Sequence, residues 1–208
     1  MHTNVNVIKH PLLEHSLTIL RDRDTQTATF RQHSKIVSTL LVVEAAKSIA
    51  TAARAIETPL AAMEGAALSE KVIVVPVLRA GLAMLFAAQD LLLDVPVGFL
   101  GLERDEETAV AREYYQKFPG RLDGYKALIL DPMLATGGSL DETVQAVERR
   151  GCNDISMVCV VAAPEGIDRV MERHSGVTLH TGAIDERLDE NKYIVPGLGD
   201  FGDRYFGT

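Results

Sequence analysis

The chain of 208 residues contains no tryptophan, only two cysteines and few aromatic residues. Cys152 and Cys159 cannot form a disulfide framework, and no histidine or further cysteine stands near them at the spacing of a metal site. We expect both thiols to be reduced and without a chemical role. No apolar run approaches the ~18 residues that span a membrane, and the N-terminus lacks the apolar stretch of a secretion signal. These absences predict a soluble cytoplasmic protein.

Clusters of positive charge are absent as well. The net charge is −8 and the lysines and arginines are scattered, so the protein has no electrostatic footprint for nucleic acid or an anionic membrane. The six histidines share no ligand spacing and are expected to be structural or exposed. The acidic run Asp185 to Glu190 predicts a solvated loop without a role. An anionic ligand would have to be held locally, by a few arginines and backbone amides, with or without a metal.

The apolar residues that are present predict the fold class. Short runs rich in β-branched residues alternate with helical patterns, and they cover Val72 to Val77, Val97 to Leu102, Ala127 to Leu130, Ile155 to Val161 and Val177 to Ala183. This alternation predicts an α/β fold, with a Rossmann-like five-stranded parallel sheet and helices on both faces. Ligands of such sheets bind at the carboxyl ends of the strands.

Three further segments flank or interrupt this alternation. Thr25 to Ile56 has a long amphipathic pattern, which predicts one or two helices against the sheet or a partner subunit. Glu103 to Gly124 is charged, and Asn191 to Thr208 is rich in glycine. Long irregular segments in a compact domain are usually lids or binding loops, so both are expected to lie near a ligand.

The stretch from Lys126 to Gly151 is the most informative part of the sequence. An apolar run ends at Asp131, a loop with two adjacent glycines follows, and apolar residues then recur at helical spacing. This order predicts a strand, a glycine loop and a helix. A glycine backbone can turn its N–H groups toward an anion, the hydroxyls of Thr136 and Ser139 add donors, and a helix N-terminus attracts negative charge. The loop is therefore predicted to bind a monophosphate.

Neither common nucleotide-binding motif fits this loop, because it lacks the Lys-Ser/Thr ending of a P-loop and the glycine spacing of a dinucleotide fold. Asp131 stands where the strand ends, so its carboxylate can accept hydrogen bonds from two neighbouring hydroxyls, as on a ribose. The two features together predict a ribose 5-phosphate site. Spacing alone also allows an ordinary loop, with Asp131 as a helix-capping acid.

Two arginines follow strands of the expected sheet. Arg79 comes after the first run and Arg104 after the second, which places both on the edge that holds Asp131. Guanidinium groups bind phosphate oxygens in pairs, so these arginines and the glycine loop predict a substrate with several phosphate groups. Each arginine taken alone is equally well explained as a surface ion pair.

The tail from Tyr193 to Asp203 is a second candidate site, since its glycines and its proline fix a backbone that few side chains cover. Uracil presents an acceptor, a donor and an acceptor along one edge, and peptide C=O and N–H groups can match that pattern. The exocyclic amine of cytosine would leave a buried group unpaired. A glycine-rich turn that closes the domain is the alternative.

The assembled motifs resemble those of the uracil phosphoribosyltransferases, a family of the type I phosphoribosyltransferase superfamily. The likeness runs nearly end to end: KHPL at Lys9, FR at Phe30, VVPVLRAGL at Val74, ERDEET at Glu103, DPMLATGGS at Asp131, VAAPEG at Val161 and YIVPGLGDFGDRYFGT at Tyr193. It implies a single phosphoribosyltransferase domain over residues 1–208, with an N-terminal helical segment (1–60), a core sheet (71–183), a flexible arm (103–124) and a base-binding tail (191–208).

The resemblance also implies a reaction, in which uracil and phosphoribosyl pyrophosphate (PRPP) give UMP and pyrophosphate in pyrimidine salvage, with magnesium bound chiefly through PRPP. The expected catalytic residues are Asp131, Arg104 and Asp200, and no residue is expected to bind the metal directly. PRPP would be bound by Arg79, Arg104, Asp131, Pro132, Met133, Leu134, Ala135, Thr136, Gly137, Gly138, Ser139 and Asp200. Uracil would be bound by Ile194, Gly199, Asp200 and Phe201.

The sequence departs from the pattern of its relatives at a few positions. Pro132 replaces the second acid of the superfamily motif, as in the uracil branch, which argues against a metal site at Asp131. Glu103 stands where relatives commonly have tyrosine, and the arm lacks a proline at Ala111 or Arg112, so we expect a more mobile arm. Phe201 replaces a common alanine and is expected to change the shape of the base pocket.

Two other functions stay open from the sequence. One is a regulatory protein of the same fold that binds RNA or DNA, although the acidic charge balance argues against it. The other is an enzyme of the same fold that acts on a purine. The resemblance further implies a homodimer or a larger homo-oligomer, and some relatives are activated by GTP.

Overall fold

A central, mostly parallel sheet organises the protein. The computed structural model describes residues 2–104 and 111–208, apart from the side chains of residues 103, 104, 111 and 112. The strands lie side by side in the order β1 (Val5–Val7), β10 (Thr178–Ile184), β9 (Asp154–Ala162), β7 (Tyr125–Leu130), β4 (Lys71–Leu78), β5 (Phe99–Arg104) and β6 (Ala111–Lys117), with β8 (Met133–Leu134) beside β9. The paired strands of this sheet are parallel except for β5 and β6.

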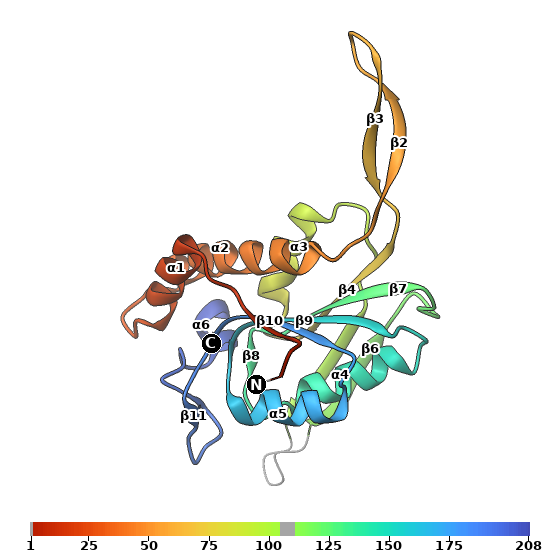
Figure 1. The fold of residues 1–208 in the computed structure, drawn as a ribbon. Coiled ribbons are helices and arrows are strands. Elements are labelled where there is room, and N and C mark those ends of the chain that lie inside the picture. Colours follow the sequence, from red (N-terminus) through yellow and green to blue (C-terminus); the bar gives the residue numbers. More distant parts are fainter. Residues whose placement is uncertain (1, 105–110) are drawn as a thin grey trace.

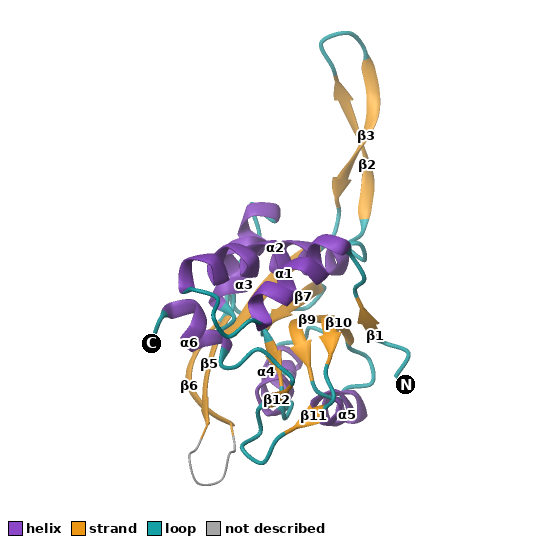
Figure 2. Cartoon of the chain, turned by 90° about the vertical axis from the view of Figure 1, so that its left-hand side faces the viewer, coloured by secondary structure: helices purple, strands orange, loops and turns teal. Residues whose placement is uncertain are grey.

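Helices cover both faces of this sheet, as Figures 1 and 2 show. One face carries α1 (Pro11–Arg21), α2 (Thr27–Ala46), α3 (Leu82–Leu91) and the short α6 (Phe201–Phe206), and the other carries α4 (Gly138–Glu148) and α5 (Pro164–Arg173). Residues of β4 alternate between the two apolar cores: Val72 and Val74 pack under α2 and α3, whereas Ile73 and Val75 pack under α4 and α5. Burial on both faces explains the nearly continuous apolar strands of the sequence.

The α/β fold and the five expected parallel strands are confirmed. The strands β1, β6 and β8 were not predicted from the sequence, because each is short or polar and lies at an edge of the sheet or off its main path. Among the described residues, no helix is both long and apolar enough to span a membrane.

The N-terminal region differs from the expectation of one helical segment over residues 1–60. Helix α2 ends at Ala46, and the next element is the strand β2 (Thr51–Glu57), which pairs antiparallel with β3 (Ala62–Leu68). This hairpin projects away from the body of the protein (Figure 1). The alanine-rich sequence favours a helix by propensity, but Thr58 closes a turn here by donating its backbone N–H and its hydroxyl to the carbonyl of Ala61.

The expected arm over residues 103–124 is also more regular than an irregular excursion. Strand β6 returns antiparallel to β5, and Leu122 is fully buried in the core. The tip of the arm, residues 105–110, lies outside the described residues. The tail forms β12 (Ile194–Val195), which pairs with β11 (Arg187–Leu188), and then α6.

Candidate active site

The glycine loop has the predicted order of strand, loop and helix. Strand β7 ends at Leu130, Asp131 follows, and α4 begins at Gly138 after Gly137, whose φ of 77° is left-handed. A small hollow of about 20 Å³ lies in this loop and is lined by Asp131, Met133, Leu134, Ala135, Thr136, Gly137, Gly138, Ser139 and Leu140. All expected phosphate-loop residues except Pro132 therefore surround one small space. The carbonyl of Pro132 instead accepts hydrogen bonds from Val160 and Val161 of β9.

A larger hollow, of about 430 Å³, lies beside the tail. All the expected uracil-binding residues line it, together with several that were not predicted; the lining consists of Ala80, Met133, Ala135, Asn191, Lys192, Tyr193, Ile194, Gly199, Asp200, Phe201 and Gly202. Met133 and Ala135 line both hollows, so the two adjoin. The structure thus brings the glycine loop and the tail, which are far apart in sequence, to one continuous site.

Two of the tail residues have structural contacts of their own. Asp200 is the N-cap of α6, and its carboxylate accepts a hydrogen bond of 2.9 Å from the backbone of Asp203. Phe201 is almost fully buried, and its ring centroid lies 5.2 Å from that of Phe30 in an edge-to-face arrangement. Most of the bulky ring is therefore in the core, and Phe201 contributes to the wall of the larger hollow without filling it.

The two arginines follow neighbouring strands of the sheet. Strand β4 lies between β5 and β7, so Arg79, Arg104 and Asp131 all stand at the carboxyl edge of the sheet. Arg79 is 65% exposed, and its Nη2 lies 3.8 Å from Oδ1 of Asp203 in α6. This pair is long and open to solvent, so it leaves the guanidinium able to meet a phosphate. Arg104 is the last residue of β5, and its side chain lies outside the described part.

An ionic cluster around a buried carboxylate lies at the start of α4, directly after the glycine loop. Asp141, in the first turn of α4, is only 1% exposed, and its carboxylate contacts His174 at 2.9 Å, Arg173 at 2.7 Å and Arg169 at 3.3 Å. Burial alone would raise the pKa of Asp141, but the hydrogen bonds from His174 and Gln145 and the charges of the two arginines outweigh it and lower the pKa. The cluster therefore holds a charged carboxylate between α4 and α5.

Sequence reasoning missed this cluster, having assigned His174 no role. The available signal was an acid just after the glycine loop together with Arg169 and Arg173, four residues apart on α5, and His174 at the end of that helix. The expectation of a solvated loop over Asp185 to Glu190 is wrong for its first residue, because Asp185 is buried and paired with Arg21.

The two cysteines are buried and have no access to a ligand. Cys159 is fully buried in β9, and burial, followed by the nearby charge of Asp131, raises the pKa of its thiol well above the usual value. Cys152 is buried as well, and both are free cysteines. In residues 2–104 and 111–208, no three histidine, cysteine or acidic side chains gather as a metal site.

Comparison with known proteins places this geometry in a family. The family model for uracil phosphoribosyltransferase matches residues 7–208. The protein is 48% identical over 208 residues to the uracil phosphoribosyltransferase of Kineococcus radiotolerans, with 98% of its own length and 99% of the relative covered. It is 46% identical over 207 residues to the enzyme of the same name from Kocuria rhizophila, with 98% of both sequences covered.

A solved structure agrees with the sequence matches. The AQ2163 protein from Aquifex aeolicus superposes with a TM-score of 0.93 at 36% identity, and the match covers 98% of each protein. Since the family model spans nearly the whole sequence and the relatives align from end to end, the protein belongs to the uracil phosphoribosyltransferase family.

Proposed function

We propose that this protein transfers the 5-phosphoribosyl group of PRPP to uracil and releases UMP and pyrophosphate. The observation that carries the proposal is that the small hollow of the glycine loop adjoins the larger hollow of the tail across Met133 and Ala135. A base in the larger hollow and a phosphate in the smaller one would leave the ribose at their shared wall. This is the order of the parts in UMP.

In this proposal the glycine loop binds the 5-phosphate. The backbone N–H groups of the loop, the N-terminus of α4 and the hydroxyls of Thr136 and Ser139 offer donors to an anion. Asp131 stands between the sheet and the loop, where its carboxylate would accept hydrogen bonds from the two ribose hydroxyls. These groups hold the sugar so that its anomeric carbon faces the tail.

The leaving pyrophosphate would be bound by arginines at the same edge. Negative charge builds on the pyrophosphate while the ribose carbon becomes cation-like, so Arg79 and Arg104 would stabilise the departing group. Shielding from water protects the cationic centre from hydrolysis, and no strong protein nucleophile is needed. Asp200, which lines the larger hollow, would lie beside PRPP.

We propose that magnesium enters the site bound to PRPP. Asp131 lines the smaller hollow and Asp200 lines the larger one, so a carboxylate is available on each side to face a metal carried by PRPP. A bound Mg²⁺ would neutralise charge on the pyrophosphate oxygens. The protein residues would then orient the metal-bound substrate.

Selection of uracil is assigned to the backbone of the tail. Ile194 and Gly199 line the larger hollow, and the glycine has no side chain to cover its peptide groups. Peptide groups held at fixed orientations match the acceptor, donor, acceptor edge of uracil, and they leave a buried group unpaired when cytosine is present. Base specificity would thus depend on how firmly the tail is held.

The experiment that tests the proposal is incubation of the protein with magnesium, PRPP and labelled uracil, with UMP as the product measured. Competition by hypoxanthine and guanine separates uracil transfer from a purine-specific enzyme of the same fold. A regulatory RNA- or DNA-binding protein would instead give a salt-dependent gel shift at micromolar protein and no UMP.

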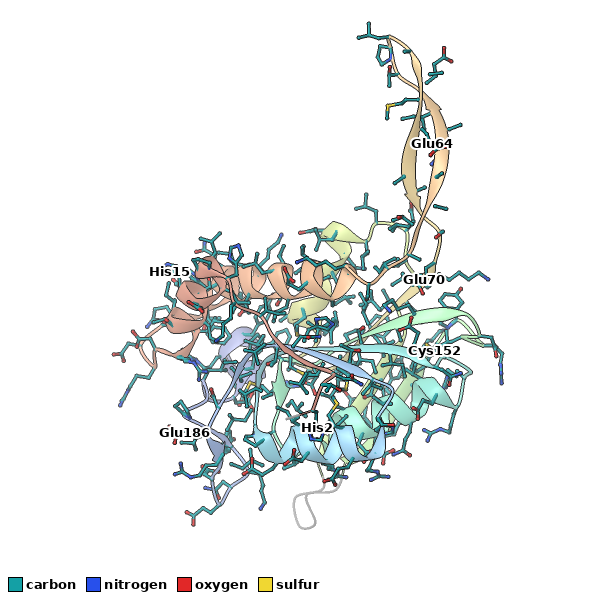
Figure 3. The ribbon with its side chains drawn as sticks, viewed as in Figure 1. His2, His15, Glu64, Glu70, Cys152 and Glu186 are labelled. Carbon is teal, nitrogen blue, oxygen red and sulfur yellow. The ribbon has the colours of Figure 1, made fainter. Side chains whose placement is uncertain are left out.

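We extend the proposal to a homodimer or larger homo-oligomer. The β2–β3 hairpin extends from the body of the protein. Figure 3 shows that its side chains, such as that of Glu64, lie away from the body. Leu60 is 96% exposed and Met63 and Leu68 are also exposed, and an isolated two-stranded hairpin is marginal in water. Packing against a second copy would stabilise it. Sedimentation of the intact protein and of a variant with the hairpin shortened would test this.

Two regulatory and cellular points complete the proposal. We propose GTP as a candidate activator, and the same UMP assay, run with and without GTP, tests this directly. The cytoplasm is proposed as the location, because Cys152 and Cys159 are free cysteines, as is usual in a reducing compartment.

A further inference from the structure

A buried ion pair connects the end of α1 with the segment before the tail. Nη2 of Arg21, the last residue of α1, donates to Oδ1 of Asp185 at 2.6 Å, and Nη1 donates to Oδ2 at 2.8 Å. The side chains are 24% and 5% exposed respectively. The two parallel contacts match the fork of a guanidinium to both carboxylate oxygens, which is the strong and orientationally specific form of this pair.

The same pair holds both polar groups of a single tail residue. The N–H of Gly197 donates to Oδ2 of Asp185 at 2.8 Å, and the C=O of Gly197 accepts from Nη1 of Arg21 at 2.7 Å. Gly197 has a left-handed φ of 58°, and a Cβ at this position would overlap the carbonyl of Ile194. The ion pair therefore fixes a backbone conformation that only glycine adopts easily.

A second arginine binds the carbonyl of the next tail residue, Leu198. Nη1 of Arg204 in α6 donates to the C=O of Leu198 at 2.8 Å and also to the C=O of Leu20, and its Nη2 donates to the C=O of Asp22 at 2.6 Å. Two successive carbonyls of the tail are thus bound by guanidinium groups that also contact the end of α1. We refer to Arg21, Asp185 and Arg204 as the tail clasp.

The tail clasp lies outside the larger hollow, in which the base is proposed to bind. None of its three residues lines the hollow, whereas Ile194 and Gly199, on either side of the clasped peptides, do. The effect of Arg21 and Asp185 on a ligand would therefore pass through the tail backbone between these two residues. A base that is read by peptide groups requires those groups to have fixed orientations before it binds.

We propose that Arg21 and Asp185 are positioning residues for base recognition, which hold the peptide groups of the tail in the orientation that accepts uracil. This inference rests on the proposed function. It assigns a role to the acidic segment that the sequence pattern left without one, and it predicts that base binding and phosphate binding can be weakened separately.

The test compares Asp185→Asn and Arg21→Lys with the wild-type protein. We expect the KM for uracil to rise about tenfold in Asp185→Asn, the equivalent of about 1.4 kcal/mol, which is the scale of one charge-assisted hydrogen bond. Arg21→Lys keeps the positive charge but loses the planar fork, so a smaller rise in the same direction is expected. The KM for PRPP should change by less than about twofold in both variants, since the glycine loop is untouched and Asp200 keeps its own contact as the N-cap of α6.

A binding measurement separates positioning from general loosening of the fold. UMP and ribose 5-phosphate share the sugar and the phosphate, but only UMP carries the base. Both variants should bind UMP more weakly and ribose 5-phosphate as the wild type does. Lys126→Gln is the matched control. Lys126 is buried and forms a 2.7 Å pair with Asp154, and both residues lie at the amino-terminal ends of their strands, away from the carboxyl ends that carry the site. It should leave both ligands unaffected.

An unchanged KM for uracil in Arg21→Lys, the milder variant, would overturn the inference even if Asp185→Asn did not fold. Equal losses of UMP and ribose 5-phosphate affinity would overturn it as well, since they would show a general structural role. Failure of the proposed function would be seen separately, as the absence of UMP formation by the wild-type protein.

Discussion

The carboxylate of Asp141 lies 2.9 Å from Nε2 of His174, and this contact joins the first turn of α4 to the C-terminal end of α5. Because α4 begins at the glycine loop, the contact fixes the helix whose N-terminus faces the expected phosphate. Arg169 and Arg173 complete the neutralisation of the buried carboxylate. The glycine loop is therefore supported by ionic contacts between α4 and the C-terminal end of α5.

Replacement of Asp141 by asparagine should lower the free energy of unfolding by about 1–3 kcal/mol at neutral pH, because the buried His174 and the half-exposed Arg169 and Arg173 lose a charged acceptor. The pKa of Asp141 is lowered from 3.8 in the folded protein, so its stabilising effect is present above that value and is lost as the pH falls through the folded-state pKa. Urea unfolding of both proteins at several pH values measures this. A stability difference that stayed constant down to pH values well below 3.8 would contradict the assignment.

The start of α5 packs directly against the glycine loop, so Gly166→Ala should disturb the loop. An added Cβ would overlap the carbonyl oxygen of Ala135, which is backbone and cannot move aside cheaply. We expect a loss of about 1–3 kcal/mol in stability and a higher KM for PRPP. Gly176→Ala is the control, since nothing lies within 4 Å of a Cβ built there. Equal behaviour of the two variants would argue against this packing role.

Asp131→Asn and Arg104→Ala test the expected catalytic contacts at the edge of the sheet. Each would remove one proposed charged contact to PRPP and should raise the activation barrier by about 1–3 kcal/mol or more. Steady-state rates with saturating uracil and varied PRPP provide the measurement. Near-native rates in both variants would refute the roles assigned to them.

Magnesium should bind to the protein only together with PRPP. We expect chelation by EDTA to abolish UMP formation and added Mg²⁺ to restore it, because the proposed substrate is PRPP with Mg²⁺ bound to its pyrophosphate oxygens. Calorimetric titration of Mg²⁺ should show no specific binding to the protein alone and clear binding once PRPP is present. A tight site in the ligand-free protein would instead point to protein ligands for the metal.

Much of this architecture could be predicted from sequence because the relevant signals are local. The strand, glycine loop and helix around Asp131 follow from hydrophobic periodicity and two adjacent glycines, and the parallel sheet follows from alternation. The hairpin after Ala46 was missed because an alanine-rich strand exposed on all sides shows neither the helical nor the alternating spacing of apolar residues. A turn and its cross-strand pairing decide that structure, and propensity does not.

The contacts that hold the site together were harder to predict. Arg21 and Asp185 are 164 positions apart, and nothing in either local sequence identifies the other as its partner. The same holds for Asp141 and His174, which are 33 positions apart. Residues that line a ligand site lie in recognisable loops, whereas the ion pairs behind those loops depend on how distant helices pack.

The most direct test of the account is UMP formation from labelled uracil and PRPP in the presence of magnesium, measured side by side for the wild-type protein and Asp131→Asn. The account predicts UMP and pyrophosphate in equal amounts from the wild type, and turnover in the variant lower by about tenfold or more. A wild-type protein that makes no UMP under these conditions, or one that prefers a purine base, would contradict it.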